Sequence, residues 1–197
     1  MNQPHPQHFS LLAGLRHYLP DASTETMHEL SSCFSVQTYS KDAPLLRQGV
    51  VWQTVGLIEE GVIRMSFLRD DGQEFNKNFY GANTLIAPLT PAMCSEPSLF
   101  GIHCVTPTRI WQCSYAQWLD TLNGQSTHLW SNLQLALLQK LITSKLQREY
   151  DLLTLSGQQR YEIFTQRFPN TAHDIPLKHL ASYLGITNVS LSRIRTN

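Results

Sequence analysis

The chain lacks the long apolar run of a membrane span, because no stretch of its 197 residues approaches the roughly 20 consecutive apolar residues that a transmembrane helix needs. The first ten residues, Met1 to Ser10, have neither the basic segment nor the apolar stretch of a secretory signal, so we expect a cytoplasmic protein. Charge of one sign is also lacking, with 15 Lys and Arg against 15 Asp and Glu. Domains that bind nucleic acids usually carry a net positive charge, so the net charge of zero argues against a nucleic-acid partner.

Cysteine is scarce and widely spaced. The four cysteines, Cys33, Cys94, Cys104 and Cys113, are separated by 61, 10 and 9 positions, and no C-x-x-C pair occurs. This spacing argues against a disulfide framework and against a zinc site. Small buried thiols in strands are the preferred interpretation, although the last three cysteines could in principle gather as metal ligands.

Convergent catalytic groups are lacking as well. Glu59–Glu60 and Asp70–Asp71 are adjacent in the sequence, so each pair either points to opposite sides of a strand or lies in a turn. No Gly-rich phosphate loop occurs, and no local context makes a cysteine and a histidine into a nucleophile and its base. The sequence therefore predicts a protein that is not an enzyme.

The middle of the chain, from Ser35 to Tyr115, has the pattern of an antiparallel β-structure. Short strand-like segments alternate with turn residues, and Val62 to Leu68 and Gln73 to Tyr80 flank an Asp71–Gly72 turn, which is a strong hairpin signal. Short strands joined by frequent turns favour a β-barrel or jelly roll over an open sheet, whose edges would need protection. We expect this barrel to form a first domain, residues 1–125.

Residues 126–153 are expected to form one long helix. Apolar positions at roughly heptad spacing trace a narrow stripe along it, formed by Leu129, Leu133, Leu137 and Leu141. A helix of about 26 residues is ~39 Å long, which exceeds the width of a small barrel. Two interpretations are open: the stripe packs on the barrel of its own chain, or it forms the seam of a symmetric homodimer. The seam is preferred, because two-fold pairing is the commonest way to cover such a stripe.

The last segment, residues 154–197, predicts a helical domain. Ser156 and Gln159 have the spacing of a capping box that begins its first helix. Pro176 and Gly185 then delimit a short amphipathic helix, and Thr187 can cap a second one.

The spacing of these two short helices is that of a helix-turn-helix. Ala181, Gly185 and Leu191 supply the small contact residue, the turn glycine and the apolar residue of the second helix. The outward positions of the second helix all carry hydrogen-bonding groups: Thr187, Asn188, Ser190, Ser192, Arg193 and Arg195. We expect Asn188, Ser190 and Arg193 at DNA bases or nearby phosphates, and the other three on the DNA backbone. An ordinary helical hairpin with a polar face is the plainer alternative.

The position of the charges removes the objection raised by their sum. Residues 1–134 contain 7 Lys and Arg against 11 Asp and Glu, a balance of −4. Residues 135–197 contain 8 against 4, a balance of +4. The positive end of the chain is thus the end that carries the predicted recognition helix.

These features together resemble the Crp/Fnr family of bacterial transcription regulators. The resemblance is carried by Gly49 and the Leu57–Arg64 segment with Gly61 in the barrel, by Asp71–Gly72 at the hairpin, and by Ile175 to Arg195 at the end. The last segment, IPLKHLASYLGITNVSLSRIR, is the most specific. The resemblance implies an α+β fold with a cyclic-nucleotide-binding-like barrel, a long helix that forms a parallel homodimer, and recognition helices in the major groove of double-stranded DNA. It also makes RNA polymerase a candidate partner.

The barrel departs from the nucleotide-binding members that it resembles. In those members an Arg meets the cyclic phosphate and a Glu meets the ribose hydroxyl. Here no Arg occurs between Arg69 and Arg109, and no acidic residue occurs between Glu74 and Glu96. Losing a charge-assisted contact in a buried site reduces affinity roughly tens- to hundreds-fold, so we expect weak or no binding of cyclic AMP.

The corresponding pocket is expected at Leu85, Ile86, Ser98 and Leu99. Only Ser98 and backbone amides are left there to meet an anion. The sequence therefore predicts an unidentified effector that is uncharged or apolar, or no effector at all.

Two cofactors and one structural element of the family are also expected to be missing. The N-terminal cysteine cluster of oxygen-sensing members is absent, so no iron–sulfur cluster is expected. His103 is the only barrel histidine available as an axial haem ligand, but a core or surface role is preferred for it. The chain ends two residues after Arg195, so most of the C-terminal wing is expected to be absent. An alternative therefore stays open: a small-molecule sensor or protein-docking module whose degenerate helical tail does not bind DNA.

Overall fold

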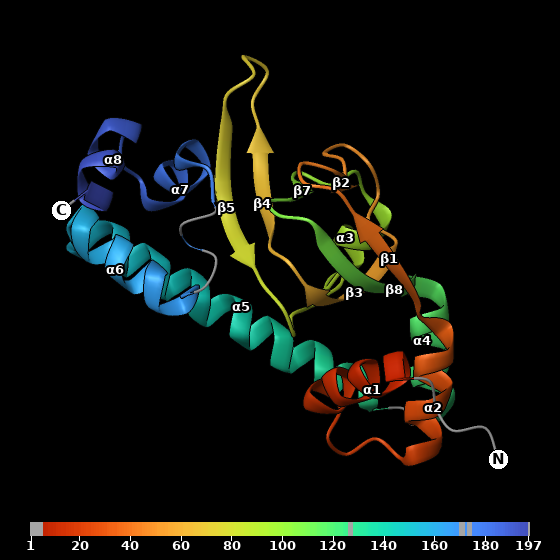
Figure 1. Cartoon of the computed structure of the whole chain (residues 1–197). Coiled ribbons are helices and arrows are strands. Elements are labelled where there is room, and N and C mark those ends of the chain that lie inside the picture. Colours follow the sequence, from red (N-terminus) through yellow and green to blue (C-terminus); the bar gives the residue numbers. More distant parts are fainter. Residues whose placement is uncertain (1–5, 126–127, 170–171, 173–174, 197) are drawn as a thin grey trace.

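The computed structural model describes residues 6–125, 128–169, 172 and 175–196 (Figure 1). Its first part contains α1 (Pro6–Tyr18), α2 (Thr24–Cys33), β1 (Ser35–Tyr39), β2 (Pro44–Leu46), β3 (Thr54–Glu60), β4 (Ile63–Leu68), β5 (Glu74–Tyr80), β6 (Leu85–Ile86), α3 (Pro91–Ser95), β7 (Gly101–Cys104) and β8 (Thr108–Ser114). Its second part contains α4 (Tyr115–Gln125), α5 (Leu129–Thr154), α6 (Gly157–Arg167), α7 (Leu177–Leu184) and α8 (Asn188–Thr196). Within this described part of the chain, no helix combines the length and apolarity needed to cross a membrane.

Two antiparallel sheets form a jelly roll, as the alternation of strands and turns predicts. One sheet has the strand order β1-β8-β3-β6 and the other has the order β2-β7-β4-β5. The long hairpin of β4 and β5 projects from the second sheet (Figure 1). Its turn contains Gly72 at φ +82°, which residues with a Cβ rarely adopt, and Asp71 accepts the backbone N–H of Gln73 at 3.0 Å. The predicted hairpin is confirmed.

The core of the barrel lies between the two sheets. Ile58 and Ile110 of the first sheet meet Ile63 and Ile102 of the second, and each of the four side chains is at most 1% exposed. A second cluster, which includes Trp118, joins the other face of the β1-β8-β3-β6 sheet to α1, α2 and α4. Burying each such side chain contributes about 1.5–3 kcal/mol, so these two clusters hold the barrel and its helices as one body.

The leucine stripe of α5 faces the barrel of its own chain. The predicted start of this helix at residue 126 lies outside the described residues. Leu133 is 3% exposed, Leu129 and Leu137 pack against the Trp118 cluster, and Leu141 lines a cavity of the barrel. Contacts within the chain therefore cover Leu133, whereas Leu129, Leu137 and Leu141 are partly exposed, and the dimer seam expected at these four leucines stays a prediction.

A different apolar stripe of α5 is exposed. Its five residues are Leu135, Ile142, Leu146, Tyr150 and Leu153, which are between 57% and 79% exposed. Because an α-helix turns about 100° per residue, spacings of seven, four, four and three keep these side chains on one face. Figure 1 shows α5 running below the strands, from the N-terminal helices at one end to α6 at the other. The described chain leaves the second stripe uncovered.

The head, α6 to α8, packs against β5. This strand ends the order β2-β7-β4-β5, so one of its edges has no neighbouring strand. Phe79 of β5 is fully buried between Phe164 of α6 and Tyr183 of α7, with ring centroids 5.5 and 5.4 Å from its own. Edge strands are commonly covered by helices to prevent unwanted pairing, and the head covers this one.

Candidate DNA interface and effector cavity

The turn between α7 and α8 has the geometry of a helix-turn-helix. Gly185 ends α7 in the left-handed conformation, with φ +67°, and its N–H donates to the carbonyl of Ala181. Thr187 begins the next helix, because its hydroxyl accepts the backbone N–H of Ser190 at 3.1 Å. The predicted roles of the turn glycine and of the capping threonine are confirmed, and so is the Ser156–Gln159 capping box at the start of α6.

Small and apolar residues bring the three helices of the head close together. Ala181 is 2% exposed at the contact between α7 and α8, and Leu184 and Leu191 are buried beside it. Gly157 at the start of α6 has no room for a side chain, since a Cβ there would lie 2.8 Å from Cγ2 of Ile186. This packing leaves the polar face of α8 pointing away from the core.

Five of the six predicted DNA-binding residues are exposed on this polar face: Thr187, Asn188, Ser190, Ser192 and Arg193. The hydroxyls of Thr187 and Ser190 lie 2.9 Å apart and bond to one another at the first turn. Val189 on the same turn is 62% exposed. Sequence reasoning missed this residue because it counted only polar groups, although an exposed apolar side chain can contact a thymine methyl group.

Arg195 has contacts inside the head. Its Nη2 donates to the carbonyl oxygens of Ala172 at 2.7 Å and of Ile175 at 3.2 Å. The guanidinium group thereby satisfies backbone acceptors in the segment that precedes α7. These bonds give Arg195 a structural role, which the sequence did not predict.

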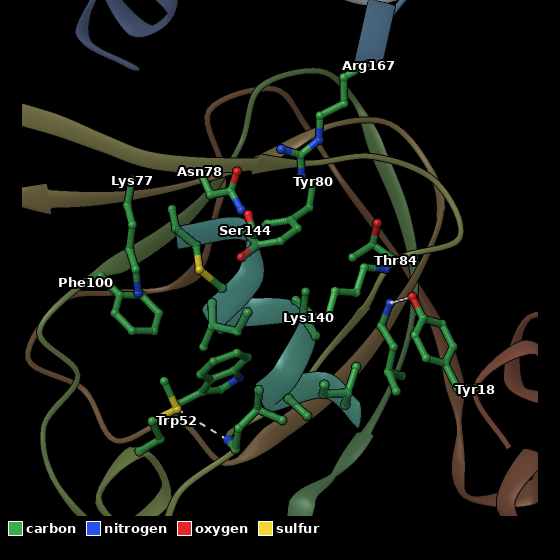
Figure 2. Close-up of a pocket in the computed structure, with 18 residues that line it drawn as sticks. Tyr18, Trp52, Lys77, Asn78, Tyr80, Thr84, Phe100, Lys140, Ser144 and Arg167 are labelled. Carbon is green, nitrogen blue, oxygen red and sulfur yellow. Dashed lines mark hydrogen bonds between the residues drawn. The ribbon is translucent and has the colours of Figure 1, made fainter. Parts of the chain in front are cut away.

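A cavity of about 150 Å³ lies in the barrel beneath α5 (Figure 2). Strands β5 and β6 contribute one wall, and the barrel-facing side of α5 contributes another. Its apolar lining comes from Trp52, Met65, Leu85, Ile86, Ala87, Leu89, Met93, Phe100, Leu137 and Leu141. Its polar lining comes from Tyr18, Lys77, Asn78, Tyr80, Thr84, Lys140, Ser144 and Arg167.

Two of the four predicted pocket residues line this cavity and two do not. Leu85 and Ile86 of β6 are buried in its wall. The Ser98 hydroxyl instead donates to the carbonyl of Phe100 at 2.8 Å, and the Leu99 side chain is 78% exposed. Ser98 and Leu99 belong to the loop before β7, of which Phe100 lines the cavity and these two residues do not.

Three cationic side chains line the cavity, whereas the sequence predicts an effector that is uncharged or apolar, or no effector. They are Lys77 of β5, Lys140 of α5 and Arg167 of α6, and the described lining contains no Asp or Glu. The Lys77 Nζ lies 4.3 Å from the ring centroid of Phe100. Burial, together with the nearby charge of Lys145, lowers the pKa of Lys77 to about 8. Sequence reasoning searched residues 69–109 for an Arg and residues 74–96 for an acidic residue, so it considered neither Lys77 nor the cations of the two helices.

A buried polar cluster joins the barrel to α7. Arg64 is 6% exposed, and its guanidinium donates to Ser66 at 2.9 Å, to Glu74 at 3.0 Å and to Asn76 at 3.2 Å. His179 of α7 is 4% exposed, and its Nδ1 lies 3.4 Å from the side-chain amide of Asn76. Burial and the Arg64 charge lower the pKa of His179 to about 4, so the ring is neutral at pH 7.

His103, the candidate haem ligand, lies outside the cavity. It is a β7 residue paired with Arg64 of β4, and burial together with that charge lowers its pKa. Among the described residues, no group of three or more His, Cys, Asp or Glu side chains could hold a metal ion.

Solved structures with a similar fold include transcription regulators. FixK2 from Bradyrhizobium japonicum matches with a TM-score of 0.67 at 16% identity, over 83% of this chain and 83% of that chain. The c-di-GMP-responsive global regulator CLP from Xanthomonas campestris matches with a TM-score of 0.67 at 13% identity, over 88% and 90% of the two chains. The sensor domain of the transcriptional regulator DNR from Pseudomonas aeruginosa matches with a TM-score of 0.57 at 23% identity, over 76% and 97%. No protein-family model matches the chain, and no curated protein matches it.

These likenesses define the fold of the chain. A jelly-roll barrel, a long helix and a helix-turn-helix head follow one another in the order found in Crp/Fnr-type regulators. The resemblance indicated by the sequence is confirmed at the level of fold.

Proposed function

We propose that the protein is a sequence-specific, double-stranded DNA-binding regulator whose barrel senses a small molecule other than cyclic AMP. The observation that carries this proposal is the exposed face of α8 on a well-packed helix-turn-helix. Asn188 and Arg193 present an amide and a guanidinium group, which can contact base edges or phosphates in the major groove. The excess of basic residues in 135–197 supports contact with phosphates.

A second copy of the chain is the proposed partner of the exposed α5 stripe. Large apolar side chains rarely stay in water along one face of a helix, and two-fold pairing buries such a face against itself. A two-fold dimer through Ile142, Leu146 and Leu153 would contain two α8 helices, one from each copy. Two heads related in this way suit a palindromic DNA site. Contact with RNA polymerase stays a prediction.

Strand β5 connects the cavity to the head. Lys77, Asn78 and Tyr80 of this strand line the cavity, whereas Asn76 and Phe79 contact the head. A ligand that moves the wall of the cavity therefore acts on the strand that holds α7. We propose that the effector changes the orientation of the head in this way, as a shift between two packed arrangements.

Cyclic AMP is a poor match to this cavity. The volume of about 150 Å³ lies below the range of ~300 Å³ and more in which drug-sized ligands bind. No carboxylate in the described lining is available to accept a hydrogen bond from the ribose hydroxyl. Calorimetry that gave a dissociation constant near a micromolar for cyclic AMP would overturn this part of the proposal.

The DNA-binding activity is tested by selecting bound fragments from a random DNA pool and measuring their affinity by fluorescence anisotropy. We expect selected fragments to bind roughly 10³-fold or more tightly than unrelated DNA at physiological salt. Micromolar binding that does not depend on the DNA sequence would contradict the proposal. It would favour instead a small-molecule sensor or a protein-docking module with a degenerate helical tail.

A further inference from the structure

The cavity beneath α5 combines a compact apolar chamber with an excess of positive charge. We propose that it binds a small organic carboxylate with a compact apolar body, such as an aromatic or branched aliphatic acid, and that Lys77 receives the carboxylate. Binding of the carboxylate is argued from the size, the walls and the charges of the cavity. Only the effect of binding, a change in the DNA-binding head, rests on the proposed function.

The size of the chamber limits the body of the ligand to about one ring. An engineered apolar protein cavity of about 150 Å³ binds benzene, and the chamber here has the same volume. Trp52, Ile86 and Met93 belong to its apolar wall, and Figure 2 shows Trp52 across the chamber from the polar groups. A benzene-sized ring or a branched chain of similar volume fills this space.

The charges of the lining favour a negative ligand. Lys77, Lys140 and Arg167 approach one chamber from three different elements. None of the three takes part in an ion pair with another described residue. Lys77 is partly desolvated and lies near the charge of Lys145, and a bound anion offsets both of these unfavourable effects. A carboxylate supplies that charge in the smallest volume.

Lys77 is the best placed of the three cations to meet the ligand. It is half-buried, whereas Lys140 and Arg167 are exposed at the rim. Its ammonium lies over the Phe100 ring, at the border between the apolar wall and a group of hydrogen-bonding side chains. Figure 2 shows the polar ends of Asn78, Tyr80 and Ser144 gathered near the middle of the chamber, where they can bond the second carboxylate oxygen.

Isothermal titration calorimetry of the full chain at pH 7, without DNA, tests the inference. The probes are benzoate, phenylacetate and isovalerate, together with the neutral amide of each acid and with phenyl phosphate. We expect at least one carboxylate to bind, and to bind at least about tenfold more tightly than its amide, because only the ion gains charge-assisted hydrogen bonds. Failure of all three carboxylates to bind at millimolar concentration would overturn the inference. Equal binding of acid and amide, or tighter binding of phenyl phosphate, would do the same.

Two variants locate the site and one serves as a control. Lys77→Met keeps the length of the side chain and removes its charge, so we expect at least about a tenfold loss of carboxylate affinity. Ser144→Leu fills the chamber from α5 with a good helix former and should abolish binding. Lys41→Met, at an exposed lysine outside the cavity, should leave binding unchanged.

Loss of carboxylate binding must be distinguished from loss of folding in each variant. Thermal unfolding is recorded for each variant, and if Lys77→Met does not fold, Ser144→Leu alone decides the location. Unchanged binding in folded Lys77→Met would show that Lys77 does not receive the carboxylate. Because the titrations contain no DNA, a protein that binds carboxylates but no DNA would contradict the proposed function and leave this inference intact.

Discussion

The backbone N–H of Asn76 on β5 donates to the hydroxyl of Ser182 on α7 at 3.0 Å. The same hydroxyl lies 3.4 Å from the carbonyl oxygen of Glu74, to which it donates. Ser182 therefore takes the place that a neighbouring strand would hold at the open edge of the sheet. This contact ties the helix-turn-helix to the strand that also forms the wall of the cavity.

Ser182→Ala is expected to loosen the head from β5. The Asn76 N–H loses its acceptor, so the interface should weaken by about 1–2 kcal/mol. Hydrogen exchange followed by NMR should show faster exchange at the Asn76 amide. Ser32→Ala is the matched control, since the Ser32 hydroxyl bonds only within the exposed face of α2. Unchanged protection of Asn76 in the Ser182 variant would contradict the proposed role of this contact.

Stability is expected to decrease in acid because of His179. Its pKa is about 4 in the folded protein and ~6.5 in an unfolded chain, so protons bind preferentially to the unfolded state. The contribution of this residue is complete above about pH 6.5 and is lost as the pH falls towards 4, by an amount on the order of 3 kcal/mol. Urea unfolding at pH 7, 6 and 5 measures this loss.

Glu74 adds to the acid sensitivity at lower pH. Burial raises the pKa of its carboxyl group, but the hydrogen bond and the charge of Arg64 outweigh burial and lower it below 4.5. The stability that Glu74 contributes is therefore present above pH 4.5 and is lost as the pH falls below it. His179→Gln, which cannot titrate, should flatten the dependence between pH 7 and 5 only. Identical pH profiles for the variant and the unchanged protein would exclude His179 as the cause.

The two arginines of α8 are expected to separate DNA binding from stability. Arg193→Ala removes an exposed side chain and should weaken specific DNA binding by ~1–3 kcal/mol without changing the free energy of unfolding. Arg195→Ala removes the bonds to the Ala172 and Ile175 carbonyls and should lower the free energy of unfolding by about 1–3 kcal/mol. Anisotropy and urea unfolding of both variants provide the comparison. An Arg193 variant with unchanged affinity would show that α8 docks differently.

The exposed stripe of α5 is expected to hold the dimer together. Ile142→Glu places a charge in the centre of the stripe and should give a monomer in size-exclusion chromatography with light scattering. Ala136→Glu is the control, because this exposed position is turned about 100° from Leu135 and about 120° from Ile142 around the helix. Leu133→Ala, in contrast, should destabilise the fold by about 2–5 kcal/mol, because its side chain is buried against the barrel. An Ile142 variant that stays dimeric would place the interface elsewhere.

Local signals predicted the turns and helix ends correctly. The Asp71–Gly72 turn, the Ser156–Gln159 capping box and Gly185 of the helix-turn-helix each depend on residues within a few positions of one another. Their conformations are set by backbone sterics and by short side-chain hydrogen bonds. Such features can be predicted from sequence because no distant residue has to be placed first.

Helical periodicity alone could not decide which face of α5 meets the barrel. The stripe that contains Leu133 and the stripe that contains Ile142 both have helical spacing, and both are rich in leucine. Only the packed barrel shows that Leu133 is covered by the same chain and that the second stripe is exposed. The sequence likewise could not decide whether the Arg195 side chain points to solvent or into the head, because that depends on the position of the Ala172 carbonyl oxygen.

The sequence by itself determined the class of fold, the helix-turn-helix and the division of charge between an acidic first part and a basic second part. The first two depend on the local pattern of residues, and the third depends only on the number of charged residues in each part. Tertiary structure alone decided the cavity and its ligand chemistry, because Lys77, Lys140 and Arg167 are far apart in the sequence and meet only when α5 and α6 pack against β5. It also decided that β5 carries both the cavity wall and the Ser182 contact, since a strand presents different groups to its two faces and its edge.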